Sequence, residues 1–159
     1  MRSARSLFLP VIITVLGLAD GLLHLYLRFT LFAGPPGGAR PAPPAGSAPP
    51  PPRAGPPVPL PLPLPTLFVL NFVGYVVLVV LLWIGPRVLG AKSWLINVAF
   101  IIYTAVTILG WLDVGGPNPR GFGYLAKGIE IVLIIALIVY TVIQGRAGEA
   151  RHRVGESVR

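Results

Sequence analysis

The chain has 159 residues, of which 54% are hydrophobic and only 11% are charged. Because about a quarter of the residues in a soluble domain are charged, this composition excludes a protein with a water-exposed surface and predicts one small membrane-embedded unit. The absence of cysteine excludes disulfides, thiol chemistry and thiolate metal sites. The net charge of +8 would indicate nucleic acid in a soluble protein. In a membrane protein, the preference for basic residues on the cytoplasmic side explains this positive charge, and we expect no nucleic-acid partner.

Four long apolar runs predict an all-α integral membrane protein with four transmembrane helices in an antiparallel bundle. Each run is long enough to cross a hydrocarbon core of about 30 Å as a helix that rises about 1.5 Å per residue. The runs are residues 7–33, 66–84, 93–112 and 122–143. The lipid bilayer is therefore the first expected partner of the chain.

The first run, residues 7–33, follows an N-terminal tail (residues 1–6) that carries Arg2 and Arg5. A basic tail before an apolar run is also typical of a secretory signal peptide. However, the run is long, and its end at Ala33 lacks the small-x-small pattern of a cleavage site. We therefore expect a retained transmembrane helix.

Residues 34–65 differ from the rest of the chain because fifteen of these 32 residues are proline. Proline fixes φ and lacks an amide donor, so the segment cannot pair in a sheet or form a stable helix. We expect a disordered, polyproline-II-like external loop between the first and second helices. A role as a ligand for a proline-recognising domain is the alternative.

The other connections carry the usual signals for the ends of helices. Gly85 and Pro86 predict that the second helix stops there and that residues 85–92 form a cytoplasmic loop. The glycine and proline residues of 113–121 predict a tight external turn. Residues 144–159 are expected to form a basic cytoplasmic tail.

The basic residues outside the apolar runs predict the orientation in the membrane. Eight lie in the two terminal tails and the second connection, against three in the other connections. The positive-inside rule then places both termini in the cytoplasm. Because small four-span layouts are common in prokaryotes, we expect a multi-pass protein of a prokaryotic plasma membrane. The layout indicates no family or activity.

Nearly all polar side chains of the runs fall at two neighbouring depths in the expected outer half. Polar groups are costly in lipid, so they should face one another across the bundle interior. We expect Arg28 to pair with Glu130 through two hydrogen bonds and Lys127 to reach the headgroups. The candidate binding residues are Asp20, His24, Arg28, Asn71, Tyr75, Tyr103, Thr104, Thr107, Lys127 and Glu130.

Gly17 and Gly21 have the small-xxx-small spacing that lets a neighbouring helix approach closely, and we expect them at a packing interface. They lie beside the polar stripe of the first run. The polar residues themselves have a purely structural interpretation, as a hydrogen-bonded network that specifies how the helices pack.

The polar cluster favours a non-enzymatic membrane protein whose outward-facing site binds a small polar ligand, a lipid headgroup or a partner helix. One alternative is a structural or accessory subunit of a larger membrane complex, or a homo-oligomer. A second alternative is a small-solute or proton-coupled transporter. Apart from Asn97 and Thr14, the inner half is aliphatic, which argues against a channel, because a channel needs polar groups through the whole membrane.

Catalysis and cofactor chemistry find little support in these residue types. The polar layers contain no serine or cysteine nucleophile, so we expect no catalytic residue. Catalytic zinc requires three protein ligands and the runs offer one histidine, His24, so we expect no metal site. Haem would need a second axial ligand beside His24, and we expect no cofactor.

Overall fold

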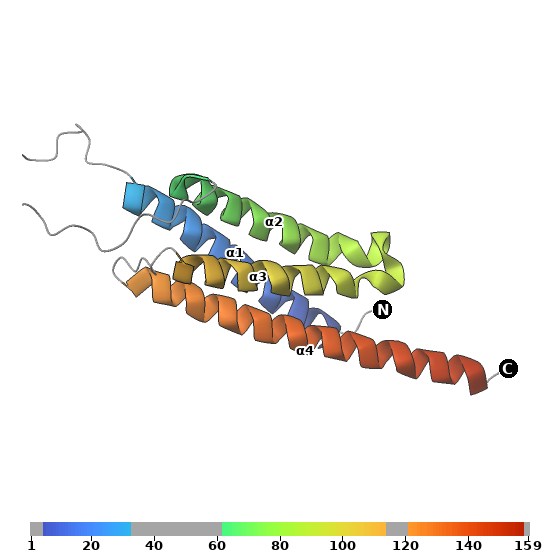
Figure 1. The fold of residues 1–159 in the computed structure, drawn as a ribbon. Helices are drawn as coiled ribbons and strands as arrows, with labels where there is room; N and C mark the ends of the chain where they lie inside the picture. The colour runs from blue at the N-terminus through green and yellow to red at the C-terminus, as the bar shows by residue number, and fades with distance from the viewer. Residues whose placement is uncertain (1–4, 33–61, 114–120, 158–159) are drawn as a thin grey trace, which may run out of the picture.

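The computed structural model describes residues 5–32, 62–113 and 121–157, which form a helical bundle (Figure 1). These residues contain four α-helices, one short 3-10 helix and no strand. The elements are α1 (Arg5–Phe32), α2 (Leu64–Val88), η1 (Gly90–Lys92), α3 (Trp94–Asp113) and α4 (Phe122–Ser157). Each α-helix contains a stretch that is long and apolar enough to cross a membrane. The prediction of four helices that are long and apolar enough to span a membrane is thereby confirmed for the described residues.

Helix α2 does not stop at Gly85 and Pro86, as the sequence predicted, but continues to Val88. A proline inside a helix forfeits the hydrogen bond to the carbonyl four residues earlier, and here that single loss falls close to the helix end. The Leu89 amide then donates to the Gly85 carbonyl at 2.8 Å. Gly90, with φ of 52°, begins η1 in a conformation that glycine adopts without strain.

Helix α4 extends to Ser157, well past the expected end of the fourth span at residue 143. Its apolar stretch ends at Arg146, and the continuation is rich in alanine, arginine and glutamate, which favour a helix. Most of the expected C-terminal tail is therefore helical. The predicted proline-rich loop and external turn fall mainly in residues 33–61 and 114–120, which lie outside the described residues.

The four helices pack through a limited set of neighbours. Helix α1 packs against both α2 and α4, while α3 packs against α4 and less extensively against α2 (Figure 1). A Cβ added to Gly21 would lie 3.3 Å from the Tyr75 Cβ, and one added to Gly17 would lie 3.1 Å from the Val79 Cγ2. Both glycines therefore face side chains of α2 at close range, and small residues there permit the approach.

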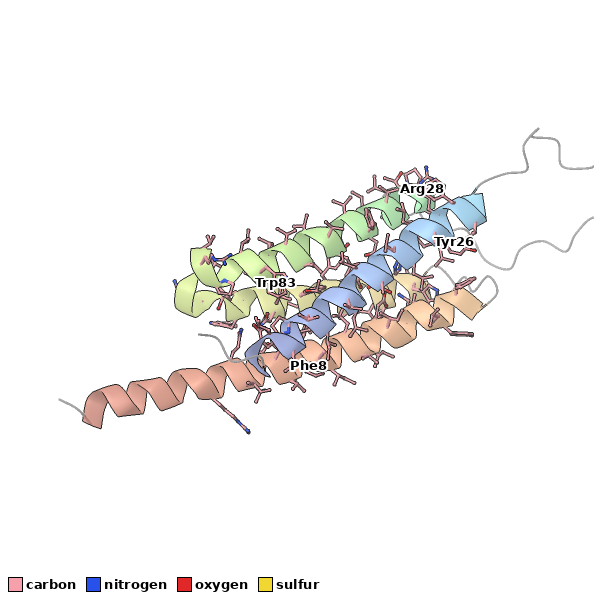
Figure 2. The ribbon with its side chains drawn as sticks, turned by 180° about the vertical axis from the view of Figure 1, so that it is seen from behind. Phe8, Tyr26, Arg28 and Trp83 are labelled. Atoms are coloured by element: carbon pink, nitrogen blue, oxygen red, sulfur yellow. The ribbon has the colours of Figure 1, made fainter. Side chains whose placement is uncertain are left out.

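The core lies between the helices, and the residues on their outer faces are not part of it. Ile13, Leu133 and Leu137 are fully buried in it together with Tyr75 and Phe100. Large aliphatic side chains on the opposite faces are exposed, as expected for contact with lipid. Figure 2 shows side chains extending from all four helices, with Phe8 near one end of α1 and Arg28 near the other.

Candidate functional site

Four ionisable side chains meet where α1 packs against α4, and we call Asp20, His24, Lys127 and Glu130 the charged cluster. The two residues on α1 are four positions apart and the two on α4 are three apart, so each pair shares one helix face. The exposed fractions are 0% for Asp20, 6% for His24, 7% for Lys127 and 0% for Glu130. Because all four are buried, their charges must be compensated by one another.

Glu130 pairs with Lys127, not with Arg28 as the sequence suggested. The Lys127 Nζ lies 2.7 Å from Glu130 Oε1 and 2.5 Å from Oε2. Lys127 reaches inward to its neighbour on the same helix and does not extend to the headgroups. Arg28 lies nearer the end of α1 (Figure 2), with its guanidinium carbon 5.8 Å from the centre of the Phe29 ring. The local i, i+3 geometry makes the lysine the nearer partner.

His24 lies between the two carboxylates of the cluster. Its Nδ1 is 2.9 Å from the backbone oxygen of Asp20 and 3.4 Å from the Asp20 Oδ2. Its Nε2 is 3.7 Å from the Glu130 Oε1. A carbonyl oxygen can only accept a hydrogen bond, so Nδ1 is the nitrogen that carries a proton. The Nε2 is thereby directed toward Glu130.

Asp20 is the least satisfied member of the charged cluster. Both of its carboxylate oxygens are buried and neither has a hydrogen-bond partner among the described residues. A buried carboxylate without hydrogen bonds costs more free energy than a buried neutral group. The buried Asp20 carboxylate therefore lowers the stability of the folded protein, and helix packing alone does not require a carboxylate at this position.

Helices α2 and α3 supply hydroxyl groups to the cluster. The Thr107 Oγ1 lies 3.0 Å from the Glu130 Oε1 and 2.7 Å from the backbone oxygen of Thr104, and it can donate its single proton to either. The Tyr75 hydroxyl is 3.3 Å from the Thr107 Oγ1. The Thr104 hydroxyl donates to the Phe100 carbonyl of its own helix at 2.9 Å. Thr107 is thus a second possible donor to Glu130 beside Lys127.

A second polar pair joins α2 to α3 beside the cluster. The Tyr103 hydroxyl donates to the Asn71 Oδ1 at 2.9 Å. Gly74 makes room for this tyrosine, because a Cβ at that position would overlap the Tyr103 phenol. The pair therefore depends on a glycine that the sequence analysis did not single out.

A pocket of about 360 Å³ opens between α1, α2 and α3, and His24 is one of its lining residues. Most of the wall is apolar, with Phe68 and Trp111 among the aromatic contributors. The polar lining comes from His24, Asn71, Tyr103, Thr107 and Asp113. The pocket therefore combines an apolar wall with hydrogen-bonding groups, two of which, His24 and Thr107, also reach Glu130.

The structure brings most of the candidate residues together and leaves one apart. Asp20, His24, Tyr75, Thr104, Thr107, Lys127 and Glu130 form one connected region, with Asn71 and Tyr103 beside it. Arg28 is near the end of α1 (Figure 2), and no ion pair of its guanidinium is found among the described residues.

Sequence reasoning missed several residues that matter in the structure. The pocket residues Phe68, Gly110, Trp111 and Asp113 carried no distinguishing spacing, because apolar and interface positions look alike in a membrane helix. A second missed feature lies away from the pocket, where the Asn97 side chain donates to the Gln144 Oε1 at 3.3 Å. The sequence could have suggested this contact, because Asn97 and Gln144 are two amides in a half of the bundle that is otherwise mostly aliphatic.

Comparison of the chain with models of protein families, with curated proteins and with solved structures finds no match in any of the three. The geometry of the pocket and of the charged cluster is therefore what bears on the function of the chain.

Proposed function

We propose that the chain is a non-enzymatic, four-span protein of a prokaryotic plasma membrane that binds a small amphiphilic ligand in the pocket between α1, α2 and α3. In this proposal the helices run antiparallel, both termini are cytoplasmic and the proline-rich segment is an external loop. The order of contacts supports the antiparallel arrangement, because Gly21 meets Tyr75 while the earlier Gly17 meets the later Val79. The excess of basic residues at the termini supports the orientation.

The observation that carries the proposal is the mixed chemistry of the pocket. Apolar side chains such as Leu67, Phe68 and Val106 would hold a hydrocarbon portion. His24 and Thr107 would meet a hydrogen-bonding headgroup, and both reach Glu130 on the far side. An amphiphile satisfies both halves of such a lining, whereas a fully polar solute would leave the apolar wall unfilled.

The packing below the charged cluster supports binding over conduction. Ile13, Leu133 and Leu137 are fully buried in the core, and the polar contacts between helices found in this half of the described bundle are few, namely Trp83 with Thr14 and Asn97 with Gln144. A pore or proton wire would need hydrated or polar groups through the entire thickness. A pocket closed on one side by aliphatic packing fits a binding site.

A matched pair of glycine variants tests the proposal. Gly110 lines the pocket, and a Cβ added there would meet no atom within 4 Å, so Gly110→Leu should fill the pocket without disturbing the helices. Gly128 on α4 offers the same open space outside the pocket lining, so Gly128→Leu is the control.

The measurement is native mass spectrometry of the protein extracted from its own membrane in a mild detergent. We expect an additional bound mass, of lipid or metabolite size, on the wild type and on the Gly128→Leu variant. The Gly110→Leu variant should lack that mass while keeping its helical circular dichroism. A bare wild-type chain, or a mass that persists in Gly110→Leu, would contradict the proposal.

A further inference from the structure

Three side chains of the charged cluster are arranged as ligands of one ion. Asp20, His24 and Glu130 each offer one ligand atom, and these atoms lie within 4.8 Å of one another. They come from α1 and α4, and the exposed fraction of each is 6% or less. The single histidine of the apolar runs had predicted no metal site, because a sequence does not show that carboxylates from two helices meet at His24.

The protonation of His24 leaves the correct nitrogen for a metal. Its Nδ1 proton is engaged by the Asp20 carbonyl at 2.9 Å, and its Nε2, which holds a lone pair whenever the ring is neutral, lies 3.7 Å from Glu130 Oε1. Two acceptors facing each other repel unless a proton or a cation lies between them. Histidines that bind metals typically donate the other ring N–H to a backbone carbonyl or a carboxylate, which orients the ring.

The Asp20 carboxylate provides an independent reason to place a cation here. It is fully buried and neither oxygen accepts a hydrogen bond within the described part of the chain. The Asp20 Oδ2 lies 3.4 Å from the His24 Nδ1, whose proton is engaged by the Asp20 carbonyl. A bound cation would satisfy the carboxylate that the protein alone leaves without a donor.

We propose that Asp20, the Nε2 of His24 and Glu130 bind one divalent transition-metal ion of the zinc class. Zinc accepts one imidazole nitrogen and carboxylate oxygens at about 2.0–2.2 Å, so neighbouring ligand atoms in a tetrahedron are roughly 3.4 Å apart. The observed 3.7 Å between His24 Nε2 and Glu130 Oε1 is close to that spacing. Lys127 and Thr107 would serve as the outer hydrogen bonds that hold Glu130 in place.

Of the three ligand residues, His24 is the one that lines the pocket. The ion, and a water or ligand group that completes its coordination, would therefore reach the site from the side of His24. The metal site does not depend on the amphiphile proposed above, since the three ligand residues are in position without it.

The test uses Co²⁺ as a spectroscopic probe on the full-length protein in detergent, after treatment with EDTA. Titration of the wild type should produce the visible absorption of Co²⁺ in a four- or five-coordinate site, saturating at one ion per chain. The His24→Phe variant should lose this absorption, while an aromatic ring remains near Phe68 and Tyr75, whose ring centres lie 5.9 Å and 6.3 Å from that of His24.

His152→Phe is the matched control, because His152 is the other histidine of the chain. It should bind Co²⁺ as the wild type does, which separates the buried site from adventitious binding by the tail. Asp20→Asn should weaken binding by at least about tenfold and keeps the size of the side chain. Circular dichroism of each variant establishes that it is folded.

Absence of Co²⁺ absorption in the folded wild type would overturn the proposal. Retention of the absorption in folded His24→Phe or unchanged affinity in Asp20→Asn would do the same. Because the amphiphile is tested separately with the Gly110→Leu variant, failure of either proposal can be distinguished from failure of the other.

Discussion

The buried ion pair between Lys127 and Glu130 allows a quantitative prediction about stability. With Nζ 2.7 Å from Oε1, the Coulomb attraction is about 6 kcal/mol at an effective dielectric constant of about 20. Lys127→Met keeps most of the side-chain length but removes this attraction and leaves the Glu130 charge buried. Because the Thr107 hydroxyl remains 3.0 Å from Oε1, part of the loss is compensated. We expect a loss of about 3–5 kcal/mol, the usual cost of breaking a buried pair from one side.

The assay is reversible unfolding in mixed micelles of a mild detergent and dodecyl sulfate, followed by helical circular dichroism. The double variant Lys127→Met/Glu130→Gln removes both charges and should regain most of the loss, so that the two single effects are strongly non-additive. Lys92→Met, at an exposed position in η1, controls for the loss of one positive charge and should change stability by no more than about 0.5 kcal/mol.

Two results would refute this reasoning about the ion pair. A loss below about 1 kcal/mol in Lys127→Met would mean that the lysine is solvated and contributes as a surface pair does. Additive losses in the double variant would mean that each side chain acts through separate contacts, and the buried pair would no longer explain the geometry.

Two further predictions concern packing and the loop. Gly74→Ala should lower the free energy of unfolding by about 1–3 kcal/mol, because the added methyl overlaps the Tyr103 phenol. The control Gly128→Ala should be neutral or should stabilise the protein by up to about 1 kcal/mol. Equal effects of the two variants in the same unfolding assay would contradict the α2–α3 packing. Deleting residues 38–58 shortens the 32-residue loop by 21 residues and should change the free energy of unfolding by no more than about 1 kcal/mol, because the entropy of loop closure depends only weakly on loop length. Loss of folded yield on deletion would contradict the interpretation of this segment as an external loop.

The sequence was sufficient for the class of protein and the existence of its four helices. Lipid imposes a simple rule, because a backbone in the hydrocarbon core must satisfy its own hydrogen bonds and an apolar run of sufficient length can do so only as a helix. The same rule marked the ionisable residues, since their cost in lipid makes any such residue conspicuous. The helix ends were less predictable, and α2 passed through Pro86 because one lost hydrogen bond is tolerable near a terminus.

Only the tertiary structure decided which polar groups meet. The sequence made Arg28 the partner of Glu130 on chemical grounds, but a small rotation or shift of one helix changes which side chain is nearest, and Lys127 was already on the same face. The pocket and the convergence of Asp20, His24 and Glu130 likewise depend on how α1 is placed against its neighbours. The hydropathy pattern predicts which residues lie within the membrane and at about what depth. Which side chains meet across the bundle depends on the rotation and crossing angle of the helices, and side-chain packing determines both.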